Sequence, residues 1–202
     1  DRLGYFGDVN IETQEVPGSQ DQVDLTLSVI EKPTGSLSLG AGYSSGEGLG
    51  LSFGLKQENA FGSGNSLGVQ LNTSKVNRVV VFNTTDPYFT PDGVSRTLDF
   101  YYRTSSPYQD QNYYQLQTSG GSLRFGVPFT ETDTVYFGGG VERTTIVPGT
   151  SLPLSYLDYA NEYGYDSSAY PLTVGWGRDR RDSAMAPNSG VLQRANAELS
   201  VV

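Results

Sequence analysis

The stretch "GSLSLGAGYSSGEGLGLSFGLKQ", residues 35 to 57, alternates apolar residues with small or polar ones in two segments joined by a Gly-rich turn. The apolar positions are Leu37, Leu39, Ala41 and Tyr43 in the first segment and Leu49, Leu51, Phe53 and Leu55 in the second. Successive side chains of a β-strand point to opposite faces, so a period of two indicates strands. The stretch predicts two antiparallel strands that share one apolar face and one small or polar face.

The same alternation continues along the chain and predicts an all-β protein with nine strands after residue 34. It recurs in "SLGVQLN" (66–72), "TLDFYYR" (97–103), "TVYFGGGVERT" (134–144), "YPLTVGWGRD" (170–179) and "VLQRANAELSVV" (191–202). We expect Leu172, Val174 and Trp176 to share the apolar face with Leu37, Leu39, Leu51 and Phe53, and Gln70 and Glu198 to share the other face with Ser38 and Ser52. Almost no segment has the three-and-four spacing of a helix.

Two segments fit the alternation less simply. "RVVVFNTT" (78–85) is apolar throughout its middle, so its faces stay unassigned. In "YYQLQTSGGSLRFGVPF" (113–129) the apolar positions change from even to odd across Gly120 and Gly121, which predicts a β-bulge or a strand that starts near Ser122.

Residues 8 to 34 differ from the rest and predict a hairpin that ends at Pro33. "DVNIETQEV" turns through "PGSQDQ" and returns through "VDLTLSVIEK". Val23, Leu25, Leu27 and Val29 share one face of the returning strand, and we expect that face to be buried.

The connections after residue 34 alternate between two kinds. The compact ones are "ENAFGSGN" (58–65), "TDPYFTPDG" (85–93), "PFTETD" (128–133) and "DRRDSAMAPNSG" (179–190), whereas those of the other parity include "SSPYQDQN" (105–112) and a Tyr-rich, acidic stretch over 145–169. In an up-and-down membrane barrel, short turns lie at the periplasmic side and longer loops outside. Phe61, Tyr88, Phe89 and Met185 lie in or beside the compact turns, so we expect them to form an aromatic and apolar girdle at the periplasmic interface. The alternative is a soluble β-sandwich whose turn aromatics cover the end of its core.

Composition excludes several classes of function. The 202 residues include no Cys and no His, so the usual zinc sites, thiol nucleophiles and Ser-His-Asp triads cannot be built. A formal net charge of −9 argues against nucleic acid as a partner. No pair of carboxylates is marked out for glycoside hydrolysis, although spacing alone does not exclude one. We expect no enzyme activity, no cofactor and no metal.

The residues also resemble a known family. "RLGYFGDVNIETQEVPGSQDQVDLTLSVIEKPTGSLSLGAGY" (2–43) resembles the junction between the last periplasmic POTRA repeat and the barrel in the bacterial family of outer-membrane β-barrel assembly factors. "NTTDPYFTPDGVS" (83–95) and "GWGRDRRDSAMAPNSG" (175–190) are similar to periplasmic turns of that barrel. The resemblance implies the tail of a POTRA repeat over 1–33, in the periplasm, and an antiparallel, up-and-down transmembrane β-barrel over 34–202, in the bacterial outer membrane.

The resemblance also implies a function and a site. In the family the first barrel strand meets the last at a weak lateral seam, and incoming outer-membrane proteins pair with its edge. The corresponding residues here are Ser36, Leu37, Ser38, Leu39, Gly40, Ala41, Gly42 and Tyr43. Partners implied are unfolded outer-membrane proteins, outer-membrane lipid and accessory assembly lipoproteins. Residues 35–44 contain three Gly, three Ser and no β-branched residue, so their own strand propensity is poor. Small residues that only make room for the contents of the lumen are the other explanation.

Alternatives to this function remain. A related POTRA-barrel protein could translocate polypeptides, and a porin-like channel would need no POTRA tail. The family's Val-Arg-Gly-Phe loop motif and closing strands are missing, so the resemblance implies a fragment with about nine strands of a larger barrel. We expect the free edge of residues 35–44 to pair with another copy or with residues 196–202 of its own chain.

Overall fold

The architecture is almost entirely β. A computed structural model describes residues 6–15, 18, 22–31, 33–106, 114–150, 152–182 and 188–201. The strands are β1 (Phe6–Glu15), β2 (Val23–Glu31), β3 (Gly35–Ser44), β4 (Gly48–Gln57), β5 (Ser66–Thr73), β6 (Asn77–Asp86), β7 (Ser95–Ser105), β8 (Tyr114–Pro128), β9 (Asp133–Pro148), β10 (Asp166–Asp179) and β11 (Leu192–Val201). A 3₁₀ turn, η1 (Ala60–Gly62), and one α-helix, α1 (Leu154–Tyr163), complete the described elements.

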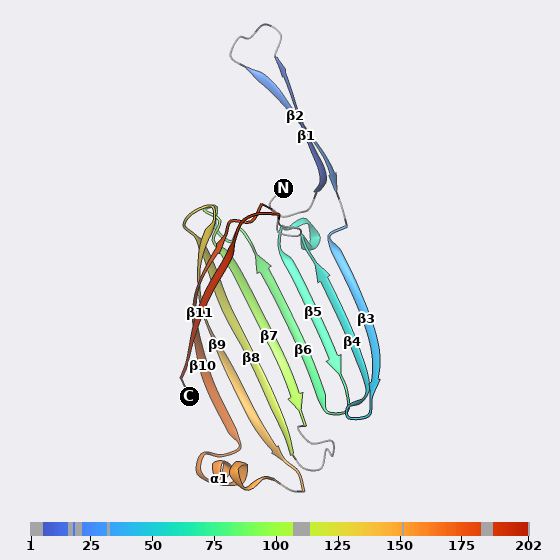
Figure 1. The fold of residues 1–202 in the computed structure, drawn as a ribbon, viewed down its shortest axis with the longest axis vertical. Coiled ribbons are helices and arrows are strands. Elements are labelled where there is room, and N and C mark those ends of the chain that lie inside the picture. Colours follow the sequence, from blue (N-terminus) through green and yellow to red (C-terminus); the bar gives the residue numbers. More distant parts are fainter. Residues whose placement is uncertain are drawn as a thin grey trace.

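The strands form two sheets. β1 and β2 pair as a separate antiparallel hairpin, and β3 to β11 form one sheet of nine strands in sequence order. Each strand of the larger sheet is antiparallel to its neighbours, which is the up-and-down topology expected from the alternation. In the described residues β3 and β11 are the two ends of an open sheet, so the expected closure of β3 on 196–202 is not found. Figure 1 shows the sheet curving between these two edges.

Cross-strand register assigns every strand to two faces. Leu39 pairs with Phe53 and Phe53 with Leu71, so their side chains share one face. We call this side the apolar face; following the register across the sheet adds Leu37, Leu51, Val80, Phe82, Leu98, Phe100, Leu123, Phe125, Val135, Phe137, Leu172, Val174, Trp176 and Leu199. The opposite side, the polar face, carries Ser38, Ser52, Gln70 and Glu198. The orientation expected from sequence is confirmed.

The apolar face is exposed instead of forming a core. Leu39 is 76% exposed, Leu172 is 56% exposed, and no described side chain of large volume is fully buried. A sandwich would bury this face against a second sheet. The sandwich alternative is therefore wrong, and the all-β, antiparallel barrel segment expected from sequence is confirmed. An exposed apolar band over many alternating strands is the pattern of a sheet that faces lipid.

β8 contains no bulge, so that prediction is wrong. Gly120 pairs with Tyr101 of β7 and Glu142 of β9, and Ser122 keeps the same register with both strands. The change of parity has another cause. The apolar band of β8 ends at Gly121, and Tyr114, beyond it on the polar face, is buried because its ring packs 5.0 Å from that of Tyr156 in α1.

Three further features of the structure were not expected from the sequence. The unassigned segment 78–85 places Val80 on the apolar face and Val79 on the polar face, so both sides are apolar there. The stretch 145–169 includes α1 and the ends of long strands β9 and β10, none of which its composition indicated. The apolar face of β2 is exposed in the described structure, with Leu25 at 68%, whereas we expected it to be buried.

The connections of the two parities lie at opposite ends of the sheet, but their lengths do not separate as expected, because the three-residue turns 45–47 and 74–76 have the parity of the longer loops. Figure 1 shows η1, the β6–β7 turn and the β8–β9 turn at the end of the sheet from which β1 and β2 project, while α1 lies at the other end. The strands are longest near α1, where β8 has 15 residues and β9 has 16. The compact turns therefore share the end that bears the hairpin.

A carboxylate anchors the compact-turn end of β9 and β10. Asp133 is 3% exposed and accepts hydrogen bonds from Arg178 Nε at 2.7 Å and Trp176 Nε1 at 3.1 Å. The hydroxyls of Thr130 and Thr132 donate to its other oxygen at 2.8 Å and 3.0 Å. Four donors on one carboxylate fix the β8–β9 turn against β10.

We expect Phe53→Arg to destabilise the full-length protein in lipid by roughly 2–4 kcal/mol, because Phe53 lies in the middle of β4 on the apolar face. Gln70→Arg, one strand away on the polar face, should change the free energy of unfolding little. Urea titration of vesicle-inserted protein measures both. Unfolding by Gln70→Arg with a harmless Phe53→Arg would mean that the faces are reversed.

We expect Asp133→Ala to lower the urea midpoint, because it leaves the Arg178 guanidinium and the Trp176 indole N–H without their acceptor. Asp179→Ala is the matched control. It removes a carboxylate at the same end that pairs with Arg181, two residues further along the chain, at 2.7 Å. Equal losses in the two variants would contradict an anchoring role for Asp133.

Candidate functional site

All eight residues predicted for strand pairing lie on β3, at one edge of the sheet. β3 pairs with β4 along its whole length, from Gly35 with Gln57 to Ser44 with Gly48. Every residue of β3 is exposed. In the described structure the other side of β3 has no strand beside it, and the structure brings the eight residues together as one free edge.

One hydrogen bond identifies the backbone groups that point away from the sheet. Glu58 N donates to Thr34 O at 2.7 Å, and the two residues are in register with the β3–β4 ladder. Hydrogen-bonded pairs alternate along an antiparallel ladder, so residues 36, 38, 40 and 42 direct their backbone groups to β4. Leu37, Leu39, Ala41 and Tyr43 direct their N–H and C=O groups outward.

The polar face of β3 has few side-chain contacts to hold it to β4. Ser38 Oγ donates to Gly54 O at 3.3 Å, Gly40 lies opposite Ser52, and Gly42 lies opposite Gly50. A Cβ added at Gly42 would meet no heavy atom within 4 Å. Small residues on both strands leave the backbone ladder as the main link on this face.

The edge carries no charge that would block pairing. The only ionisable side chain of β3 is Tyr43, and the Lys56–Glu58 ion pair at 2.6 Å lies beyond it, on β4 and the following turn. Edge strands in soluble proteins are usually protected by charged side chains, Pro or bulges. β3 has none of these and pairs with β4 without a register shift.

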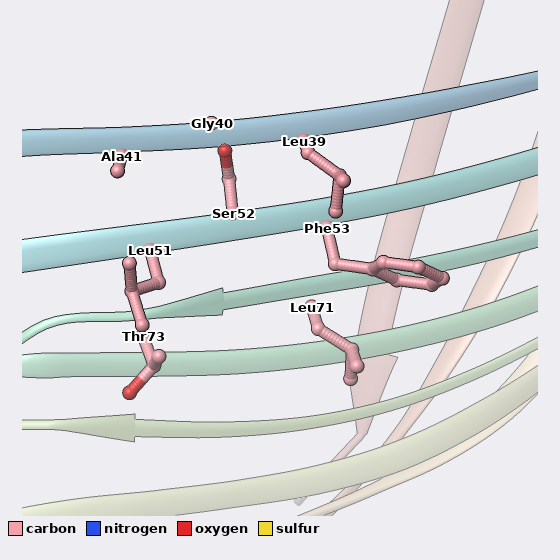
Figure 2. Close-up of a pocket in the computed structure, with 8 residues that line it drawn as sticks. All are labelled: Leu39, Gly40, Ala41, Leu51, Ser52, Phe53, Leu71 and Thr73. Carbon is pink, nitrogen blue, oxygen red and sulfur yellow. The ribbon is translucent and has the colours of Figure 1, made fainter.

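A depression of about 600 Å³ lies beside the middle of β3 on the apolar face. Figure 2 shows two cross-strand rows at this site, one of Ala41, Leu51 and Thr73 and one of larger side chains. The second row consists of Leu39, Phe53 and Leu71. Ala41 projects least and leaves a notch in the apolar face at the edge of the sheet.

Three of the four residues predicted for the periplasmic girdle lie in described turns. Phe61 is fully exposed in η1 with a φ of 54°, and Tyr88 is more than half exposed. Phe89 packs 5.9 Å from Phe125 between ring centroids, and Arg96 lies 4.3 Å over its ring. Met185 lies outside the described residues. The compact-turn end therefore holds Phe61, Tyr88 and Phe89, and a shared girdle stays a prediction.

Sequence reasoning missed the Asp133 anchor and assigned no contacts to Asp179, Arg180, Arg181 and Asp182, a cluster of four charged residues. The available signal was the "TETD" turn (130–133) at the start of β9, together with Trp176 and Arg178 on β10. The sequence did not indicate that Asp133 contacts these two residues. In the cluster, Arg181 donates to both oxygens of Asp179, and Asp182 accepts from the backbone N–H of Asn188 at 3.0 Å. These local contacts favour a structural role in the turn over docking of a partner.

The described residues include no cluster of metal ligands and no membrane-spanning helix. No group of three or more His, Cys, Asp or Glu side chains in the described residues is placed to hold a metal ion. Neither described helix has the length and apolar character needed to traverse a bilayer. The most distinctive feature is an uncharged strand edge with outward backbone donors and acceptors on an apolar sheet.

Comparisons with known proteins agree with this description. The chain is 38% identical to the outer membrane protein assembly factor BamA of Neisseria meningitidis over 98% of its own length, and 29% identical to BamA of Nitratidesulfovibrio vulgaris over 95%. It is 35% identical to the chloroplastic outer envelope protein 80 of rice over 48%. The chain spans about a quarter of the length of these BamA relatives, 26% and 23%.

A solved structure gives the same likeness in three dimensions. The crystal structure of BamA from Haemophilus ducreyi lacking POTRA domains 1–3 matches all of this chain and 40% of that chain, with a TM-score of 0.71 and 27% identity. The Omp85 superfamily domain matches residues 59–202, which include β5 to β11. The chain therefore belongs to the Omp85 superfamily.

Proposed function

We propose that this chain is part of an assembly factor that folds β-barrel proteins and inserts them into the bacterial outer membrane. β3 is the strand on which an incoming protein first pairs. The observation that carries this proposal is the free, uncharged edge of β3 on a sheet with an exposed apolar face. The names of the BamA relatives, which match nearly the whole chain, support the same function.

The driving force is the cost of an unpaired strand edge in lipid. Each backbone donor or acceptor without a partner costs several kcal/mol in the hydrocarbon region. Leu37, Leu39, Ala41 and Tyr43 each direct a donor and an acceptor outward. A strand of an unfolded outer-membrane protein has the matching set, so pairing satisfies both edges at once by strand addition.

Release requires that the pairing be exchangeable. β3 has poor strand propensity, and its polar face offers few cross-strand contacts. The register of a strand paired with β3 therefore depends mostly on backbone hydrogen bonds. A later strand can replace it at the same edge. Membrane lipid surrounds the apolar face in this proposal and keeps water from competing for the edge.

The remaining parts of the chain have supporting roles in this proposal. Residues 1–33 are the end of a POTRA repeat in the periplasm, which places the compact turns at the periplasmic side together with the girdle of Phe61, Tyr88, Phe89 and Met185. Accessory assembly lipoproteins would bind outside the sheet.

A polypeptide translocator of the same superfamily is the nearest alternative. The relative that matches 98% of this chain is named an assembly factor, which supports assembly.

We expect Ser38→Cys in the full-length protein to form a disulfide with a Cys on a strand of a model outer-membrane protein during its insertion into vesicles, with copper–phenanthroline and air added as the oxidant. Ser38 directs its backbone to β4, so its pair across the free edge is non-hydrogen-bonded. Cα atoms in such pairs approach to about 4.5 Å, within disulfide range. Non-reducing electrophoresis at timed points measures the adduct.

Ser52→Cys is the matched control, because Ser52 lies on the same face of β4 with a strand on either side. It should give no adduct. Adducts from Ser52→Cys as readily as from Ser38→Cys, or efficient insertion with no adduct from Ser38→Cys, would contradict pairing at β3.

A further inference from the structure

We infer that the notch beside Ala41 is a socket for one bulky apolar side chain of the strand that pairs with β3. The side chain belongs to the residue directly opposite Ala41. This inference rests on the proposed function and adds a position-specific preference: the incoming strand carries a large aliphatic or aromatic residue there, not a small or polar one.

The shape of the notch supports a single side chain. Along β3, Ala41 lies between Leu39 and Tyr43, whose side chains are 76% and 81% exposed. Across the sheet the notch is closed by Leu51 of β4, with Thr73 behind it. Figure 2 shows that the side chain of Ala41 ends well short of the level reached by its larger neighbours. Apart from Gly40, Ala41 is the lining residue with the smallest side chain on the edge strand, and no described strand lies on its other side.

The rest of the sheet shows how such openings are filled. On the apolar face, a Cβ added at Gly121 of β8 would lie 2.9 Å from Phe100 Cδ1 of β7, and one at Gly139 of β9 would lie 3.2 Å from Leu172 Cδ2 of β10. Each small residue is thus covered by a large side chain of the strand beside it. Close packing of a large against a small residue stabilises neighbouring strands.

The polar face follows the same pattern. The ring of Tyr101 lies over Gly120, with its Oη 2.5 Å from an added Cβ. Tyr136 of β9 lies over Gly126 of β8 with Cε1 at 3.0 Å. Ala41 differs from these glycines because, in the described residues, it has a strand on one side only, where Leu51 of β4 lies opposite it.

Backbone pairing with β3 positions the side chain of the incoming strand at the notch. Ala41 directs its N–H and C=O outward, so an antiparallel partner residue exchanges two hydrogen bonds with it and places its side chain on the same, apolar face. A lipid acyl chain could enter the notch but has no hydrogen bond to hold it there. A side chain on a paired strand is held by the packing in the notch and by the backbone hydrogen bonds of its own residue to Ala41. We therefore favour it as the occupant.

The test varies the two sides of the contact in the full-length protein, reconstituted in phosphatidylcholine vesicles with a model outer-membrane protein. Adducts with Ser38→Cys first locate the residue opposite Ala41. That residue is then changed to Phe, Leu, Ala and Ser. We expect Phe or Leu to give roughly two- to fivefold more adduct than Ala or Ser, the range of cross-strand pair energies.

Filling the notch should reverse the preference. With Ala41→Phe, or the milder Ala41→Leu, the substrate with Ala at that position should pair better than the substrate with Phe. Leu55→Phe is the matched control, since Leu55 shares the apolar face, lies on β4 with a strand on either side and does not line the depression. It should leave the preference unchanged. Heat-modifiable migration of each variant confirms its fold, and the substrate series needs no change in the protein.

The outcomes separate the socket from the proposed function. Adducts that form equally with Phe, Leu, Ala and Ser would overturn the socket and leave strand pairing at β3 intact. Loss of a bound acyl chain on Ala41→Phe, with no change in the substrate preference, would identify lipid as the occupant and also overturn it. Absence of any adduct from Ser38→Cys would contradict the proposed function itself.

Discussion

The structure depends on one constraint, which is that backbone donors and acceptors facing hydrocarbon need partners within protein. From β4 to β10 every strand meets this need through antiparallel ladders on both sides. In the described residues the two end strands, β3 and β11, meet it on one side only. β11 carries Arg194 and Glu198, whereas β3 carries no charged side chain, so β3 is the uncharged one of the two edges.

Small residues have two different roles in this sheet. In β8 and β9, Gly120, Gly121 and Gly139 lie under large side chains of neighbouring strands, so they allow close packing. In β3, Gly42 has open space around its Cβ position. Gly40 of the same strand lies against Ser52 of β4, whose Oγ would clash with an added Cβ, so the open space in β3 is confined to the position of Gly42. Composition alone does not distinguish these roles, because the difference lies in the strand alongside.

The two ends of the sheet are organised by different interactions. At the compact-turn end, Asp133 joins the β8–β9 turn to β10 through Arg178 and Trp176, and Arg96 covers the ring of Phe89. At the other end, α1 covers Tyr114 of β8 through Tyr156. The edge strand β3 takes part in neither set. It is thus held mainly by its ladder with β4, which suits a strand whose pairing changes.

The sequence by itself determined the strand pattern, the two faces and the parity of the turns. Alternation of Leu39 with Gly40 or of Phe53 with Ser52 follows directly from the period of a strand, so these assignments needed no tertiary information. Resemblance to a family of assembly factors also came from the residues of the β3 region and the compact turns. The membership was then established by relatives and by the Omp85 domain over 59–202.

Only the tertiary structure decided the features that depend on a neighbour. The change of parity of the apolar residues in 113–129 reflects the packing of α1 over Tyr114, not a bulge. At this end of β8 an apolar side chain is buried under the helix, on the face opposite the exposed apolar face of the middle of the strand. α1 itself forms in a stretch whose composition indicated a loop. The Asp133 anchor joins residues 43 and 45 positions apart in the chain. The notch at Ala41 exists because its neighbours on two strands are larger, and register, which sequence does not specify across strands, sets which neighbours those are.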